Sequence, residues 1–260
     1  MGEPEGIIAE VQAIAAQAGE IALRYFGRVS AELKHDESYV TEADKQVEEF
    51  IRRQLGARFP RDGIIGEEFD RSRAGTSDWT WAIDPIDGTT NFVAGLPHWA
   101  VCIARLRDGR SELGVTNVPV LGEMYTAARG HGALLNGRAL QIPDRLPPEH
   151  EQLLAVWSTA FRHITLEFPG KVRILGSTVL KLLYTARGAY IGALTPTVHV
   201  WDVASGLPVL WEAGGEARSF DGTLYEAADM DPAHGYAVPP LVLARPGLQK
   251  RVRELFTVTR

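Results

Sequence analysis

Cysteine and histidine are scarce in this sequence, and their placement excludes several kinds of site. Cys102 is the only cysteine in 260 residues, so the chain has no internal disulfide and no zinc site built from cysteines. The seven histidines are scattered, and none forms a pair at the spacing of metal ligands. A metal ion bound by this chain would therefore rely on oxygen ligands.

An excess of positive charge is also absent. The formal net charge is −6, and no basic run offsets the acidic residues. This balance argues against nucleic acid or an anionic membrane as the main partner. Bound cations are the obvious means by which such a protein would attract an anionic substrate.

Neither a targeting segment nor a membrane span is evident. The start, MGEPEGIIAEV, is acidic and lacks the basic beginning and apolar centre of a signal peptide. No apolar run approaches the roughly 18–20 residues that span a bilayer. We therefore expect a cytoplasmic protein with no membrane partner.

What is present is the composition of an ordinary globular protein. Hydrophobic residues make up 45% of the chain and charged residues 23%. A chain of this length can bury the core of one large domain or of two closely packed ones. The residue patterns change near position 146, and we expect parts 1–145 and 146–260 to form one compact unit.

The first part begins with helical periodicity and continues with strands. Apolar spacing predicts a helix over 5–26, whereas 29–39 is charged and unpatterned, which predicts an exposed loop. Thr41 is a good N-cap for a second helix, with Asp44 three residues on. Strands are then predicted over 64–65 and 79–84, and a meander of strands over 98–107, 111–118, 122–127 and 132–136.

The second part alternates between the two periodicities. The patterns predict a strand near 153, a helix over 179–186, a strand over 189–192, a helix over 202–213, and a final strand and helix within 241–256. Strands that are bunched first and alternate with helices later predict a layered protein of mixed α+β and α/β class.

The densest chemical signal is the run WAIDPIDGTTNF at 81–92. A strand delivers Asp84 at its carboxyl end, and Pro85 should end the ladder there. Asp87 follows after a tight turn, and residues 88–90 then expose backbone N–H groups. Two carboxylates beside such donors can bind cations on one side and a phosphate on the other.

Two more acidic segments complete the pattern. Glu67 follows an apolar strand, and Asp202 opens a helix after Trp201. Magnesium takes oxygen ligands, and two such ions roughly 3.5–4 Å apart can stabilise the attacking and leaving oxygens of an in-line displacement. The carboxylates Glu67, Asp84, Asp87 and Asp202 form a suitable ligand set.

Each acidic motif also has an ordinary structural explanation. Asp-Pro and Asp-Gly are common turn dipeptides, and adjacent glutamates are usually a solvated pair. Asp202 could be an N-cap, and Thr41 and Asp44 could serve as a helix cap without any catalytic role. Taken singly, only the run 84–90 favours a functional interpretation.

Together these segments resemble the inositol monophosphatase family of metal-dependent, lithium-sensitive phosphatases. The run 81–92 is similar to the first family signature, and WDVASG at 201–206, continuing to EAGG at 212–215, is similar to the second. Further elements in the family's order are VTEAD at 40–44, GEE at 66–68, the stretch 122–137 and GST at 176–178. The resemblance covers nearly the whole chain.

The resemblance implies a layered αβαβα sandwich of the sugar-phosphatase type, usually a homodimer. It implies two or three magnesium ions at the site and inhibition by lithium. The metal ligands that it implies are Glu67, Asp84, the carbonyl of Ile86, Asp87 and Asp202.

The remaining roles follow from the same resemblance. Asp44 and Thr89, together with Glu67, would orient and deprotonate the attacking water. The N–H groups of Gly88 and Thr89 would hold the phosphate. The substrate would contact three further residues, namely Gly176, Ser177 and Thr195.

One departure concerns the substrate. Inositol-selective members carry an acidic side chain shortly before the Trp-Asp signature, which binds ring hydroxyls, but 192–199 contains no acid here. That stretch looks more like histidinol-phosphate phosphatases, whereas the Thr89-Thr90 pair looks like the inositol branch. We expect a phosphomonoesterase of inositol-1-phosphatase type acting on a small phosphorylated metabolite. Histidinol phosphate, fructose 1,6-bisphosphate and 3′-phosphoadenosine 5′-phosphate are the alternatives.

Three other readings have less support. A bisphosphate substrate would need extra cations, for which the candidates are Lys34, Arg162, Lys171, Arg173 and Lys181. A metal-binding regulatory protein without catalysis would require a missing ligand or water activator, and none is missing from the pattern. A nucleotide-binding fold is weaker still, because no G-x-G-x-x-G follows a strand.

Overall fold

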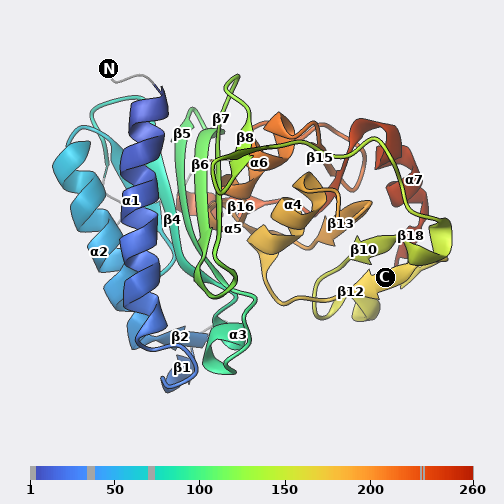
Figure 1. Ribbon diagram of the computed structural model, residues 1–260, viewed down its shortest axis with the longest axis horizontal. Helices are drawn as coiled ribbons and strands as arrows, with labels where there is room; N and C mark the ends of the chain where they lie inside the picture. Colours follow the sequence, from blue (N-terminus) through green and yellow to red (C-terminus); the bar gives the residue numbers. More distant parts are fainter. Residues whose placement is uncertain (1–3, 34–38, 70–73, 229, 231, 260) are drawn as a thin grey trace.

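The computed structural model has five layers and describes residues 4–33, 39–69, 74–228, 230 and 232–259. In Figure 1, α1 and α2 form one outer layer, followed by a seven-stranded sheet and then by α4, α5 and α6. A five-stranded sheet and α7 complete the stack. This order confirms the predicted αβαβα sandwich.

The outer helices are α1 (Pro4–Leu23) and α2 (Glu42–Arg58). The capping box predicted for α2 is present, with Thr41 as the N-cap and Asp44 three residues on. By length and apolar composition alone, Glu5–Leu23 would be sufficient to span a membrane. In this fold one side of α1 packs on α2 and the seven-stranded sheet, where it buries Val11, Ile14, Ala15, Ala18 and Ala22.

The first sheet contains seven strands, of which the first two are parallel and the others antiparallel. In spatial order they are β3 (Gly63–Gly66), β4 (Trp79–Asp87), β5 (Ala100–Arg107), β6 (Arg110–Val118), β7 (Glu123–Ala128), β8 (Ala133–Leu135) and β9 (Arg138–Leu140). The predicted hairpin turn is present, since Asp108 and Gly109 both have positive φ, at 51° and 74°.

The predicted end of a strand at Asp84 is wrong. β4 continues through Pro85 to Asp87, with a shift of register between Asp84 and Asp87. Proline is tolerated at such an irregularity because the ladder hydrogen bond that it cannot donate is already interrupted. With this shift of register, Asp84 and Asp87 both lie on β4.

The middle layer consists of α4 (Thr178–Ala186), α5 (Val200–Ala204) and α6 (Gly206–Glu212). The single helix predicted over 202–213 is therefore two helices that meet at Ser205. Pro208 lacks the N–H that would bond to the Ala204 carbonyl, so a continuous helix cannot pass this point undisturbed.

The second sheet has the order β12 (Lys171–Arg173), β10 (Leu153–Ala155), β13 (Gly192–Thr195), β17 (Leu241–Ala244) and β15 (Glu216–Ser219). Its outer face is covered by α7 (Gln249–Glu254). The strand predicted over 189–192 lies three residues later, because the chain first turns at Gly188, where φ is 73°. β15 was not predicted. The expected boundary at 145/146 falls between the two sheets.

Smaller elements connect the layers. They are β1 (Ala31–Leu33) with β2 (Tyr39–Thr41), α3 (Thr89–Val93), β11 (Ile164–Leu166) with β18 (Phe256–Val258), and β14 (Val198–His199) with β16 (Ala237–Val238). The described part of the chain also contains the 3-10 helices η1 (Pro119–Leu121), η2 (Glu149–Glu151), η3 (Ala160–Arg162), η4 (Pro232–His234) and η5 (Pro246–Leu248).

The pairing of β1 with β2 corrects the prediction of an unpatterned loop over 29–39. The ends of this segment form an antiparallel pair, with Glu32 opposite Val40. The middle of the segment, including the candidate cation Lys34, lies outside the described residues.

Candidate metal centre

Three acids from separate segments of the chain lie close together. Glu67 follows β3, Asp84 lies on the neighbouring β4, and Asp202 lies in the first turn of α5. One carboxylate oxygen from each lies within 4.8 Å of the other two. The parallel pairing of β3 with β4 and the packing of α5 on β4 produce this cluster.

Asp84 is the most deeply buried of the three, with 1% of its surface exposed. Its Oδ1 accepts a hydrogen bond from the Ile86 N–H at 3.0 Å, whereas its buried Oδ2 has no partner among the described residues. Burial, followed by repulsion from Glu67, Asp87 and Asp202, holds the pKa of Asp84 well above its ordinary value. An unpartnered buried oxygen among carboxylates fits a hard cation such as Mg²⁺.

Asp202 is partly buried and combines a structural with an electrostatic role. Its Oδ2 accepts a hydrogen bond from the backbone N–H of His199 at 2.7 Å, which caps the start of α5. Burial and the charges of Glu67 and Asp87 hold its pKa well above the ordinary value. The N-cap itself is His199, so the expectation that Asp202 is an N-cap is wrong: Asp202 is the third helical residue and caps through its side chain.

Asp87 contacts a different element. Its carboxylate accepts hydrogen bonds from the Ser177 hydroxyl, from the Thr178 N–H at 3.0 Å and from the Val179 N–H at 3.1 Å, all at the start of α4. Burial raises the pKa of Asp87 to about 6 although these bonds lower it. Asp87 lies outside the three-acid cluster, and its predicted role as a metal ligand stays a prediction.

Asp44 and Thr89 face each other, while the role in activating water that the resemblance implies for them stays a prediction. Oδ2 of Asp44 accepts from the Thr41 N–H at 2.8 Å and from the Thr41 hydroxyl at 2.5 Å, while Oδ1 lies 3.4 Å from the Thr89 hydroxyl. That hydroxyl also lies 3.0 Å from the Ile86 carbonyl oxygen. Burial is the largest cause that raises the pKa of Asp44 to about 6.

Gly88 fixes the turn between β4 and α3. Its φ is 94°, and a Cβ at this position would lie 2.9 Å from the His98 carbonyl oxygen. Only glycine adopts this conformation without strain. The turn places the N–H groups of Gly88 and Thr89 at the start of α3, where the sequence predicts phosphate binding.

The predicted substrate contacts divide into two groups. Gly176, with φ of 75°, and Ser177 immediately precede α4, and Ser177 lies beside Asp87. Thr195 is instead fully buried in β13, and its hydroxyl oxygen accepts a hydrogen bond from the Leu241 N–H at 3.3 Å. This burial does not support a direct contact between Thr195 and a substrate.

Comparison with known proteins agrees with this geometry. The model of the inositol monophosphatase family matches residues 3–254. The chain belongs to the inositol monophosphatase family. Its members are phosphatases that act on small phosphorylated substrates and depend on metal ions.

Individual relatives in the family carry different names. A histidinol-phosphatase from Chlorobaculum parvum is 38% identical over 219 residues, which cover 80% of this chain and 84% of that one. An inositol-1-monophosphatase from Rhizobium meliloti is 35% identical, with 82% and 84% covered. The solved structure of an IMPase from Thermotoga maritima has a TM-score of 0.80 at 28% identity and covers 94% of each chain. Overall identity does not select one substrate.

Three residues that support the site were not identified from the sequence. Buried Glu48 accepts a hydrogen bond from the Glu68 N–H at 2.8 Å and so fixes the segment that carries Glu67. Asn91 bridges the His98 and Leu175 carbonyls, each at 2.7 Å. Lys181 was considered only as a candidate for a second phosphate. The separation of four residues between Ser177 and Lys181 was the signal in the sequence that could have placed Lys181 on the same side of the helix as Ser177.

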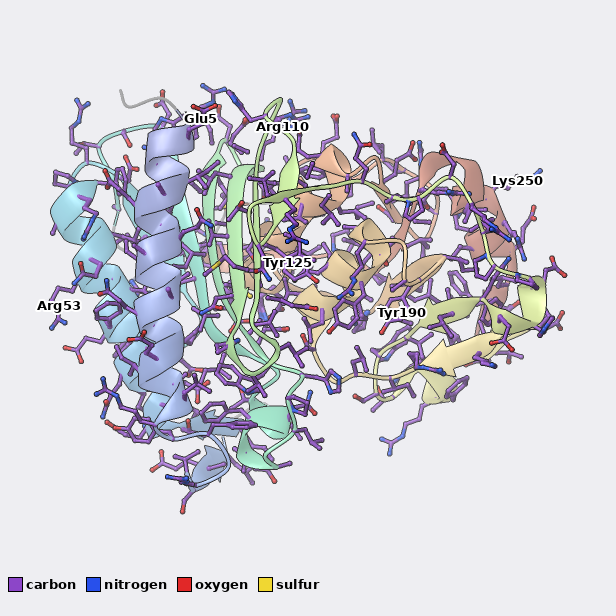
Figure 2. The ribbon with its side chains drawn as sticks, viewed as in Figure 1. Glu5, Arg53, Arg110, Tyr125, Tyr190 and Lys250 are labelled. Atoms are coloured by element: carbon purple, nitrogen blue, oxygen red, sulfur yellow. The ribbon has the colours of Figure 1, made fainter. Side chains whose placement is uncertain are left out.

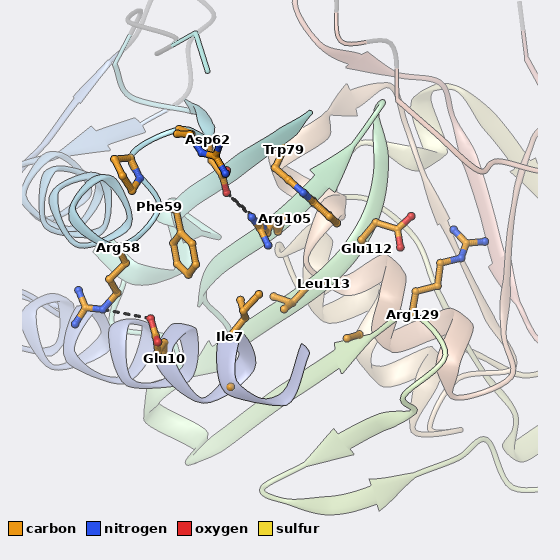
Figure 3. A pocket seen from close by; sticks show the side chains of 14 residues that line it. Ile7, Glu10, Arg58, Phe59, Asp62, Trp79, Arg105, Glu112, Leu113 and Arg129 are labelled. Carbon is orange, nitrogen blue, oxygen red and sulfur yellow. Dashed lines mark hydrogen bonds and ion pairs between the residues drawn. The ribbon is translucent and has the colours of Figure 1, made fainter. Parts of the chain in front are cut away.

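A pocket of about 450 Å³ lies away from these acids (Figure 3). It lies between α1, the end of α2 and the first sheet, with Phe59 and Trp79 among its lining residues. Arg105 stacks on Trp79 at 4.2 Å and donates to Asp62 at 2.7 Å. Nearby, Arg58 lies 3.7 Å from Glu10. The predicted metal ligands do not line this pocket.

Proposed function

We propose that the protein is a magnesium-dependent phosphomonoesterase of inositol-1-phosphatase type, acting on a small phosphorylated metabolite. The observation that carries the proposal is the cluster of Glu67, Asp84 and Asp202, in which Asp84 is buried and has one unpartnered oxygen. Burial first, and repulsion between neighbouring acids second, raise the pKa of Asp84 and Asp202, and acids in such surroundings favour a cation as their partner.

The residues that would hold two or three Mg²⁺ ions are Glu67, Asp84, the carbonyl of Ile86, Asp87 and Asp202. The chemistry that Mg²⁺ supplies when bound is a lowered pKa of the attacking water and neutralisation of charge on the phosphate. The same acidic ligand set would bind lithium, so we expect lithium to inhibit.

Thr89 and Asp44 would move the proton of the attacking water. Thr89 Oγ1 accepts this proton while its own proton passes to Oδ1 of Asp44, 3.4 Å away. With a pKa of about 6, Asp44 is ionised at neutral pH and can accept it. Glu67 helps to orient the water, and the N–H groups of Gly88 and Thr89 hold the phosphate.

The released alcohol is less closely specified than the phosphate. Residues 192–199 contain no acid that could bind the hydroxyls of an inositol ring, and the nearby Thr195 is buried. Charge-assisted hydrogen bonds of that kind are worth roughly 1.5–3 kcal/mol each. Without them, selectivity for inositol 1-phosphate should fall before turnover does.

Histidinol phosphate is the second candidate substrate, and an aromatic group near Asp202 favours it. The rings of His199 and Trp201 stack at 4.7 Å, and Trp201 lies 5.9 Å from Tyr236. The His199 side chain is 50% exposed. A planar imidazole can stack on such rings as one aromatic group on another.

A phosphate-release panel tests this proposal. It would compare inositol 1-phosphate, histidinol phosphate, fructose 1,6-bisphosphate and 3′-phosphoadenosine 5′-phosphate with and without Mg²⁺. We expect activity only with Mg²⁺, and kcat/KM for inositol 1-phosphate to exceed the next best by no more than about tenfold. Several hundredfold selectivity for inositol 1-phosphate would contradict the account of the substrate.

The assembly and location that we propose rest on the family resemblance and on composition. We propose a homodimer in the cytoplasm, with neither nucleic acid nor membrane as partner. Sedimentation of the purified protein tests the homodimer, and fractionation of the source cells tests the location.

A further inference from the structure

Lys181 is a buried cation in the layer between the two sheets. Only 4% of its surface is exposed, although lysine is almost never fully buried without a partner. It lies on α4, four residues after Ser177, and therefore on the same face of that helix. Because helical side chains lean toward the N-terminus, this face directs Lys181 toward Asp87, which contacts Ser177.

Two acids of the proposed metal centre act on this ammonium group. Asp87 and Asp202 favour the charged form of Lys181, whereas burial lowers its pKa to about 8. Among the described residues, Lys181 has no carboxylate within ion-pair distance and no hydrogen bond from its side chain. Its charge is therefore close enough to act on both acids and is not cancelled by a direct ion pair.

We propose that Lys181 is a built-in counter-charge for Asp87 and Asp202 that weakens the metal ion bound by these two acids. This inference rests on the proposed function, because it requires the metal centre. The proposal predicts two classes of metal ion that differ in affinity. An ion held chiefly by Glu67 and Asp84 binds tightly, and the ion next to Asp87 and Asp202 binds weakly and exchanges readily.

Electrostatics gives the sign of the effect of Lys181 on metal binding. A positive charge beside two acidic ligands repels an arriving metal ion. In the metal-free protein, the same charge offsets part of the repulsion between the acids, as the metal ion would. In a buried site, one unit charge acting on a divalent ion changes binding by at least about tenfold. Lys181 should therefore stabilise the metal-free protein and destabilise the fully loaded one.

Calorimetric titration of Mg²⁺ into metal-stripped protein tests the proposal. Lys181→Met removes the charge and nearly keeps the length of the side chain. Lys181→Gln also removes the charge but leaves a polar group in place. Lys181→Arg keeps the charge. Lys250→Met is the matched control, because Lys250 is 90% exposed and lies at the far end of the molecule (Figure 2). The readouts are the number of ions, their dissociation constants and the melting temperature.

We expect the neutral variants to bind the weaker ion at least about tenfold more tightly, with the tighter ion changed far less. Their melting temperature should fall without metal and rise above wild type with saturating Mg²⁺. A purely structural role would lower both temperatures. Lys181→Arg and Lys250→Met should keep wild-type affinities.

Other results would overturn the proposal or its premise. Unchanged affinity for the weaker ion in both neutral variants, or equal tightening in Lys181→Arg, would show that the charge does not control this ion. If the neutral variants fail to fold even with saturating Mg²⁺, Lys181 is structural and the proposal is also wrong. If wild type binds no Mg²⁺ at all, the proposed function itself fails.

Discussion

Thr89 Oγ1 lies 3.4 Å from Oδ1 of Asp44, although 45 residues separate the two in the chain. The other oxygen of Asp44 accepts two hydrogen bonds from Thr41 and thereby caps α2. One carboxylate thus fixes the start of a helix and faces the hydroxyl predicted to activate water. The cap holds the orientation of Asp44, so the start of α2 would help to position the proposed proton path.

Replacing Thr89 with alanine should lower kcat by roughly 10²–10⁴, because the proton path to Asp44 is lost. Thr89→Ser keeps the hydroxyl and should retain most of the activity. Steady-state kinetics with the best substrate of the panel measures both. A Thr89→Ala protein that melts earlier but turns over normally would show that this residue only stabilises the turn at α3.

The response of stability to Mg²⁺ should grow with pH. Burial raises the pKa of Asp44 and Asp87 to about 6 from 3.8, and raises those of Asp84 and Asp202 as well. The folded metal-free protein therefore binds more protons than the unfolded chain. Through these groups its stability falls as pH rises from about 4 through about 6.

Mg²⁺ favours the ionised acids and should offset that loss. We expect the increase in melting temperature on adding Mg²⁺ to be several degrees larger at about pH 7 than at about pH 5. Comparing the two states at each pH cancels the titration of groups outside the site. An equal or smaller increase at the higher pH would contradict the placement of these acids around a cation.

Asp62 should be important for stability but not for catalysis. It is 4% exposed and accepts hydrogen bonds from Ser77 Oγ at 2.7 Å, Trp81 Nε1 at 3.0 Å and Arg105 Nη2 at 2.7 Å. Asp62→Ala leaves the largely buried Arg105 unpaired, which should cost about 3–5 kcal/mol of unfolding free energy.

Denaturant unfolding measures that loss, and kcat with saturating Mg²⁺ should stay within about twofold of wild type at a temperature where the variant is folded. Glu226→Gln is the matched surface control. Its ion pair with Arg110, at 3.2 Å, is about half exposed, so the change should cost less than about 1 kcal/mol. A large fall in kcat for Asp62→Ala would mean that this acid acts on the metal centre.

Local signals in the sequence predicted much of the site. The Thr41 cap, the helices around 5–26 and 179–186 and the acids after apolar strands depend on short-range patterns, so their elements could be read directly. The layered arrangement followed from the order of strands and helices. The resemblance to a family then brought Glu67, Asp84 and Asp202 to one place.

Long-range contacts decide the features that the sequence did not reveal. The direction of the Asp87 carboxylate depends on Ser177, which is 90 residues away. The burial of Thr195 depends on its pairing with Leu241 in the second sheet. Lys181 was one of five candidate cations, and only packing distinguishes a buried lysine from a solvated one.

The most direct test of the metal centre is Mg²⁺-dependent phosphate release by Asp84→Asn. Metal-stripped wild type should regain activity as Mg²⁺ is added. The variant should stay lower by roughly 10³ or more, because the cation supplies several kcal/mol of transition-state stabilisation. Its metal-free form should melt no earlier than wild type, since asparagine has nearly the same shape and cannot carry the negative charge that burial and the neighbouring acids disfavour at this position. Near wild-type kcat for Asp84→Asn at saturating Mg²⁺ would contradict the assignment of this cluster as the catalytic metal centre.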